Sequence, residues 1–118
     1  MKRNHRTLRV WQSAIELVDD VYRATSRFPK DEVYGLTSQM RRSAVSVPSN
    51  IAEGCARGGT KELLHFLNIA GGSLSELDTQ VEIACRQGYI SEPGVLCEKI
   101  DGVFAMLVGL MSSLKRKS

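Results

Sequence analysis

The side chains in this 118-residue chain that could bind a metal or react belong to two histidines, three cysteines and one Glu-x-x-His sequence. Glu62 and His65 have the i, i+3 spacing with which di-iron helical bundles bring a carboxylate and an imidazole to one metal. Such a centre needs a second Glu-x-x-His pair and two further glutamates, and His5 is the other histidine of the chain. The pattern therefore predicts no metal site.

Other reactive patterns point the same way. Cys55, Cys85 and Cys97 are widely spaced and form no Cys-x-x-Cys pair, which is typical of small buried residues in a reducing cytoplasm. The glycine-rich residues 54–59 (GCARGG) lack the Lys-Ser/Thr end of a phosphate-binding loop, and the chain has no Gly-x-Ser-x-Gly elbow. We therefore expect no catalytic residues, no cofactor and no small-molecule substrate.

Positive charge is concentrated at the two ends of the chain and near its middle. Residues 1–9 contain no acidic residue, and Arg57 and Lys61 flank the glycines of the central segment. In an up-down helical bundle these three segments meet at one pole, where clustered cations attract phosphates. The candidate nucleic-acid-binding residues are Lys2, Arg3, Arg6, Arg9, Arg57, Lys61, Lys115, Arg116 and Lys117.

Two features argue against a specialised nucleic-acid site at this pole. The formal net charge is a modest +3, and basic chain ends are often simply solvated. The aromatic residues near it, Trp11 and Phe66, have core-like spacing, which disfavours sequence-specific reading of a single strand.

These residues must be positioned by helices. The most informative helix is predicted to start near Gly35, at a residue that the pattern leaves open, and to stop at Gly58 and Gly59. Leu36, Met40, Val47 and Ile51 follow the 3.6-residue period of an apolar stripe. The opposite side carries small or apolar residues where a surface helix usually has Lys and Glu. Either small residues are simply good helix formers, or this second face packs against a neighbouring subunit. The candidate interface residues are Arg42, Val45, Ser49, Ala52, Glu53 and Ala56.

Pro48 lies inside this helix and removes the amide that would bond the Ala44 carbonyl. Ser46, Ser49 and Asn50 offer polar groups to the freed carbonyls. Since the apolar stripe continues in phase across Pro48, we predict one helix kinked there in preference to two short helices.

The next helix is predicted to begin at Thr60 as its N-cap and to end near Gln87, with an uninterrupted heptad seam from Leu63 to Ala84. Gly71 and Gly72 within it indicate either a close helix approach or a tolerated flaw. Ser73, Glu76 and Gln80 lie along one edge, while Arg42 and Glu53 border the preceding helix. These polar residues are either solvated or form Arg–Glu pairs within or between subunits.

The flanking segments complete the predicted architecture. Residues 7–25 predict a first helix with a broad apolar face, and a seam from Leu96 to Leu114 predicts a last helix capped by Ser91. We expect residues 1–118 to form a single all-α domain, an antiparallel up-down-up-down four-helix bundle. No segment has the apolar length of a transmembrane helix, so we expect a cytoplasmic protein.

The segment QMRRSAVSVPSNIAEGCARG followed by FLNIAGGSLSELDTQVEIA resembles the four-helix-bundle proteins encoded in intervening sequences of bacterial 23S ribosomal RNA genes. The resemblance extends from about Leu8 to Leu114. It implies a short cytoplasmic helical protein that assembles as a homopentameric ring. A relative is the accessory protein of diversity-generating retroelements, to which nucleic-acid binding through a basic surface is attributed. The family has no established catalytic residues.

Two hypotheses of different classes follow. The first is a non-enzymatic homo-oligomer, a pentamer by resemblance, that binds RNA or a ribonucleoprotein through the basic pole. The alternative is a protein-protein scaffold with no nucleic-acid role, in which the basic ends are incidental.

Overall fold

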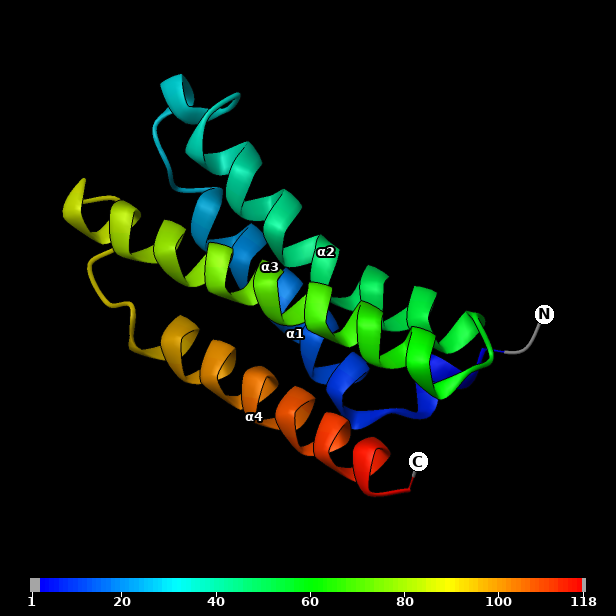
Figure 1. Ribbon diagram of the computed structural model, residues 1–118. Helices are drawn as coiled ribbons and strands as arrows, with labels where there is room; N and C mark the ends of the chain where they lie inside the picture. The colour runs from blue at the N-terminus through cyan, green and yellow to red at the C-terminus, as the bar shows by residue number, and fades with distance from the viewer. Residues whose placement is uncertain (1–2, 118) are drawn as a thin grey trace.

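The computed structural model describes residues 3–117, which fold into four antiparallel α-helices and two short 3₁₀ turns, with no strand in that range. The helices run up-down-up-down, and both chain ends lie at the same end of the bundle (Figure 1). This arrangement confirms the predicted all-α four-helix bundle. The elements in chain order are η1 (Asn4–Thr7), α1 (Arg9–Thr25), η2 (Lys30–Glu32), α2 (Leu36–Ala56), α3 (Thr60–Arg86) and α4 (Gly94–Lys117).

Each helix packs against two others around an elongated bundle of 46 × 26 × 19 Å. α2 contacts α1 and α3, and α4 closes the bundle by contacting α1 and α3. The predicted seams supply the core, since Met40, Val47, Leu74 and Leu107 are all buried. Apolar periodicity therefore identified the inward faces of α2, α3 and α4.

α2 continues without a break through Pro48, as one helix and not two. Asn50 lies close by and donates its Nδ2 hydrogens to the Ser46 carbonyl at 2.8 Å and to Ser46 Oγ at 2.9 Å. The Asn50 side-chain amide therefore donates to Ser46. It does not replace the donor that the Ala44 carbonyl lacks because Pro48 has no N–H. The kink at Pro48 stays a prediction.

Helix ends differ from expectation by a few residues. α1 begins at Arg9 because residues 4–7 form a separate 3₁₀ turn. Gly59, not Thr60, is the N-cap of α3. α4 begins at Gly94, and the Pro93 carbonyl, not Ser91, accepts the hydrogen bond of the Cys97 amide at 2.9 Å. Gly88, with φ of 79°, follows the end of α3 in the left-handed conformation that favours glycine.

The close approach of two helices occurs at Gly54, not at Gly71 and Gly72. A Cβ on Gly54 would lie 2.9 Å from Phe66 Cβ and 3.4 Å from Leu63 Cα, so α2 meets the backbone of α3 there. A Cβ built on Gly72 would have no neighbouring atom within 4 Å. The expectation that the Gly71–Gly72 pair marks a close contact is not supported within the protomer.

At the end of the bundle away from the chain termini, Glu32 joins two connections. Its Oε1 accepts the Leu36 amide at 3.0 Å, and its Oε2 accepts the Tyr89 hydroxyl at 2.8 Å. These hydrogen bonds favour the charged carboxylate and lower the pKa of Glu32. The α1–α2 connection is thereby fixed to the α3–α4 connection.

Candidate functional site

Three segments distant in sequence meet at the basic pole, which we define by the candidate nucleic-acid-binding residues. Asn4, Thr7 and Leu8 line one groove together with residues 58–60 of the α2–α3 turn and with Leu110 and Leu114 of α4. Figure 1 shows the start of the chain, this turn and the end of α4 at the same end of the bundle. These three segments therefore meet at one end of the bundle, as the predicted helix order requires.

The cations of the basic pole face solvent. Lys2 lies outside the described residues. The other candidate residues are exposed, namely Arg3, Arg6, Arg9, Arg57, Lys61, Lys115, Arg116 and Lys117. Exposed cations on three adjacent segments can contact a polyanion without a costly change in the fold.

One of these cations is partly occupied by neighbours in its own chain. Arg57 Nε lies 3.0 Å from Glu53 Oε2, and its guanidinium lies 5.1 Å from the centre of the Phe66 ring. Glu53 pairs with Arg57 four residues away, and no ion pair between Glu53 and Arg42 occurs among the described residues. An exposed pair of this kind is weak and screened by salt, so Arg57 stays able to exchange partners.

The aromatic residues near the basic pole, Trp11 and Phe66, are half-buried, and Trp11 packs against the hydrophobic core. Trp11 has the Arg6 guanidinium 5.8 Å from its ring and the His5 ring at 5.1 Å edge-on. Phe66 likewise meets Arg57 on its face and His65 at 5.2 Å. Each ring therefore holds an arginine near the pole through cation–π attraction.

The outward face of α2, defined by the candidate interface residues, is uncovered in the protomer. Arg42, Val45, Ser49, Glu53 and Ala56 are exposed and Ala52 is half-buried. The exposed fraction of Val45 is 39%. The inward face is buried against the other helices. α2 therefore has apolar or small residues on two sides, of which only the inward side is covered within the protomer.

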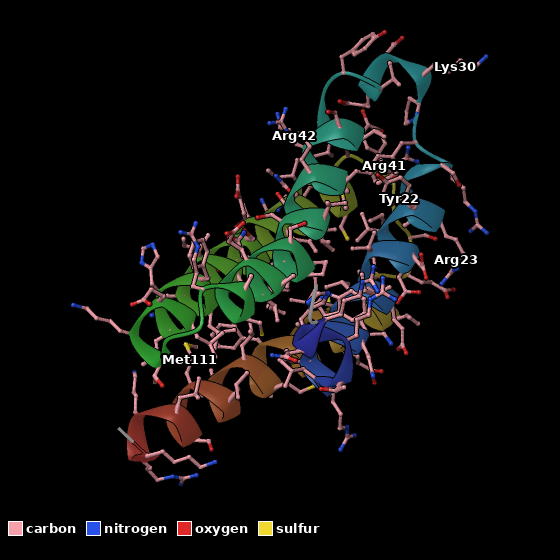
Figure 2. The ribbon with its side chains drawn as sticks, turned by 90° about the vertical axis from the view of Figure 1, so that its right-hand side faces the viewer. Tyr22, Arg23, Lys30, Arg41, Arg42 and Met111 are labelled. Atoms are coloured by element: carbon pink, nitrogen blue, oxygen red, sulfur yellow. The ribbon has the colours of Figure 1, made fainter. Side chains whose placement is uncertain are left out.

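α1 and the α1–α2 connection extend this outward face with residues that sequence reasoning did not select. Ile15 and Tyr22 are 37% and 43% exposed, and the Arg41 guanidinium lies 4.4 Å from the centre of the Tyr22 ring (Figure 2). A groove of about 570 Å³ is lined by Tyr22, Val33, Arg41, Val45 and neighbouring polar residues. The broad apolar face predicted for the first helix was the signal that could have identified them.

The remaining candidates are the side chains that the sequence suggested for chemistry. Within residues 3–117, no group of three or more His, Cys, Asp or Glu side chains is placed to hold a metal ion. Cys55, Cys85 and Cys97 are unbridged and half-buried, and burial raises the pKa of Cys55 and Cys97. Within the same range, every helix is too short or too polar to cross a membrane.

Comparison with known protein families identifies the family of this chain. A family model described as 23S rRNA-intervening sequence protein matches residues 6–109, which include the outward face of α2 and half of the described basic pole, namely Arg6, Arg9, Arg57 and Lys61. No curated protein matches the chain.

Proposed function

The chain belongs to the 23S rRNA-intervening sequence protein family, and from this premise we propose that it is a non-enzymatic cytoplasmic module that assembles with copies of itself. We further propose that the assembly binds RNA or a ribonucleoprotein through the basic pole. A homopentameric ring is the form that the family resemblance suggests.

Assembly is supported by the outward face of α2. Val45 there and Ile15 on α1 leave apolar surface exposed, and Ser49, Ala52 and Ala56 are small enough to let a neighbouring backbone come close. A contact between this face and a different face of the next copy is heterologous, and repetition of such a contact closes a ring when the rotation from one copy to the next is a whole fraction of a full turn. The unbridged cysteines fit a reducing compartment.

RNA binding is supported by one observation above all, the meeting of three cationic segments at one pole with their side chains exposed. A ring repeats this pole in every copy. Because linked sites act at high effective concentration, weak attraction at each pole adds up to strong binding by the whole ring.

Binding of wild-type protein to RNA over a salt series tests this function. An electrostatic footprint predicts that the logarithm of the binding constant falls linearly as the logarithm of salt concentration rises. An affinity that does not change between low and moderate salt would contradict RNA binding by the basic pole.

A specific groove favours the alternative, a protein-protein scaffold. Leu8, Val10, Met106 and Leu110 line an apolar groove of about 510 Å³ between the start of α1 and α4, beside the basic pole. An apolar groove with a cationic rim suits a protein partner. Affinity capture that yields proteins but no nuclease-sensitive material would favour this alternative.

A further inference from the structure

A second groove, of about 440 Å³, lies between α2 and α3 on the side of α2 away from Tyr22. Its lining includes Ser43, Ser46, Ser73 and Gln80, with Arg42 and Glu76 of opposite charge also among its residues. We call it the α2–α3 groove. In Figure 2, Arg41 and Arg42 point to different sides of α2, and Arg41 is the one that points toward Tyr22.

Hydrogen bonds organise the middle of this groove. Asn50 donates to Ser46 Oγ at 2.9 Å, and Ser46 Oγ lies 2.8 Å from Ser73 Oγ on α3. Ser73 is buried although it belongs to a helix edge for which solvated surface was one of the two expectations. The hydroxyl of Ser46 therefore links α2 to α3 and leaves the groove polar.

Gln80 lines the same groove but takes no part in these hydrogen bonds. The residue is only 6% exposed, and its buried Oε1 has no hydrogen-bond donor among residues 3–117. A buried carbonyl without a donor costs free energy relative to one that is bonded, so such groups in native proteins usually have a partner. The terminal torsion of a glutamine is soft, so a small rotation brings its amide toward a group that enters the groove.

The charges beside Gln80 indicate what kind of partner fits. Arg42 and Glu76 have no ion-pair partner among the described residues. A ligand of a single charge would meet one like charge here, whereas a protein surface with both signs can pair with each. A copy of this chain carries both signs.

The groove is also continuous with the proposed assembly surface. Arg42 and Ser46 line both the α2–α3 groove and the neighbouring groove that contains Val45 and Tyr22. A copy that covers the outward face of α2 therefore reaches the edge of the α2–α3 groove.

We propose that a second copy of this chain covers the α2–α3 groove and places a hydrogen-bond donor against Gln80 Oε1. This inference rests on the proposed assembly and extends its surface from α2 onto α3. Gln80 then acts as a specificity residue whose hydrogen bond is complete only in the assembly.

Gln80→Met tests this contact because Met has a similar size, favours helices and lacks the acceptor. We expect the dissociation constant of the assembly, measured by sedimentation over a dilution series, to rise about tenfold or more. The isolated protomer should be as stable as wild type or more stable, since an unpartnered carbonyl has been removed. Gln87→Met, at an exposed position just past α3, is the matched control and should change the constant less than about twofold.

A second variant does not depend on a buried substitution. Gln39 is exposed and lines the same groove, so Gln39→Trp fills the groove without disturbing the core. We expect it to weaken assembly about tenfold as well.

The outcomes separate this inference from the proposed function. A wild-type protein that is a single copy at every concentration would overturn the proposed assembly itself. An assembled wild type with an unchanged constant for Gln80→Met or Gln39→Trp would overturn the groove contact alone. A Gln80→Met protomer less stable than wild type would also overturn it, because the amide would then be supporting the protomer.

Discussion

At the scale of single residues, Gly54 and Gly72 show that the same residue type has opposite roles in α2 and α3. Gly54 is buried where the two helices touch, and an added methyl group would press on Phe66 Cβ and Leu63. We expect Gly54→Ala to lower the free energy of unfolding by about 1–3 kcal/mol, the usual effect of overpacking.

Gly72→Ala is the matched control, because Gly72 is exposed within α3 and has open space around its Cα. Replacing a helical glycine by alanine should raise the free energy of unfolding by up to about 1 kcal/mol. Urea denaturation measures both variants. Effects of equal sign would contradict the packing described for Gly54.

Glu32 gives a prediction of pH dependence. Its pKa is lowered in the folded protein by the Leu36 amide and the Tyr89 hydroxyl, so the unfolded chain takes up a proton at higher pH than the folded one. The stability that Glu32 contributes is therefore fully present above the unfolded pKa of about 4.3 and is lost as pH falls through the folded pKa.

Glu32→Gln should consequently lose stability near neutral pH and show a shallower fall between about pH 5 and pH 3 than wild type. Thermal denaturation at a series of pH values measures this difference. Glu98→Gln, an exposed carboxylate with no hydrogen bond among the described residues, is the control. Parallel curves for wild type and Glu32→Gln would contradict the role assigned to Glu32.

At the scale of elements, α2 has two faces suited to packing, and only the inward face is covered by other helices of the same protomer. If a sister copy covers the other face, a large charged side chain there must block assembly. We expect Ser49→Arg to shift the protein to single copies while its helical circular dichroism and melting stay near wild type.

Ser75→Arg places the same side chain at an exposed position of α3 and serves as the control. It should leave the mass of the assembly unchanged. Equal masses for Ser49→Arg and wild type would show that the outward face of α2 is not the interface.

Element existence and inward faces could be predicted because apolar periodicity depends only on the chain itself. Contacts between helix edges could not, because they depend on how two helices cross. Ser73 and Gln80 read as polar edge residues, yet both are buried, and Ser46 Oγ of α2 lies 2.8 Å from Ser73 Oγ. Gly54 could not be distinguished from Gly72 for the same reason.

At the scale of the whole molecule, the bundle gathers its basic chain ends and the α2–α3 turn at one pole. We expect Arg9→Gln, Arg116→Gln and Lys117→Gln together to weaken RNA binding. Since each lost phosphate contact changes the salt slope by about 0.7–0.9, the slope should become shallower by about 2–3 for each copy.

An equal change of charge at the other end of the bundle is the control. Arg23, Arg27 and Lys30 are exposed near the end of α1 and the following connection, and Figure 2 shows Arg23 and Lys30 there. Replacing these three residues by Gln should leave the slope close to wild type. Equal losses from both variants would mean that net charge, and not the basic pole, drives binding.

The basic pole could be predicted because helix order alone decides which ends meet. The cation–π contacts at Trp11 and Phe66 could not, because spacing does not show how far a ring is covered. Ile15 and Tyr22 enlarge the outward face. Their spacing in the sequence places them on one side of α1, but only the folded structure shows that this side lies beside α2.

The central claim is that α2 is covered on its inner side by its own bundle and on its outer side by a sister chain. Light scattering coupled to size-exclusion chromatography of the full chain tests it most directly. The account predicts a mass that is a multiple of 13.0 kDa, with five copies in the proposed ring. A mass of 13.0 kDa at every concentration would contradict it.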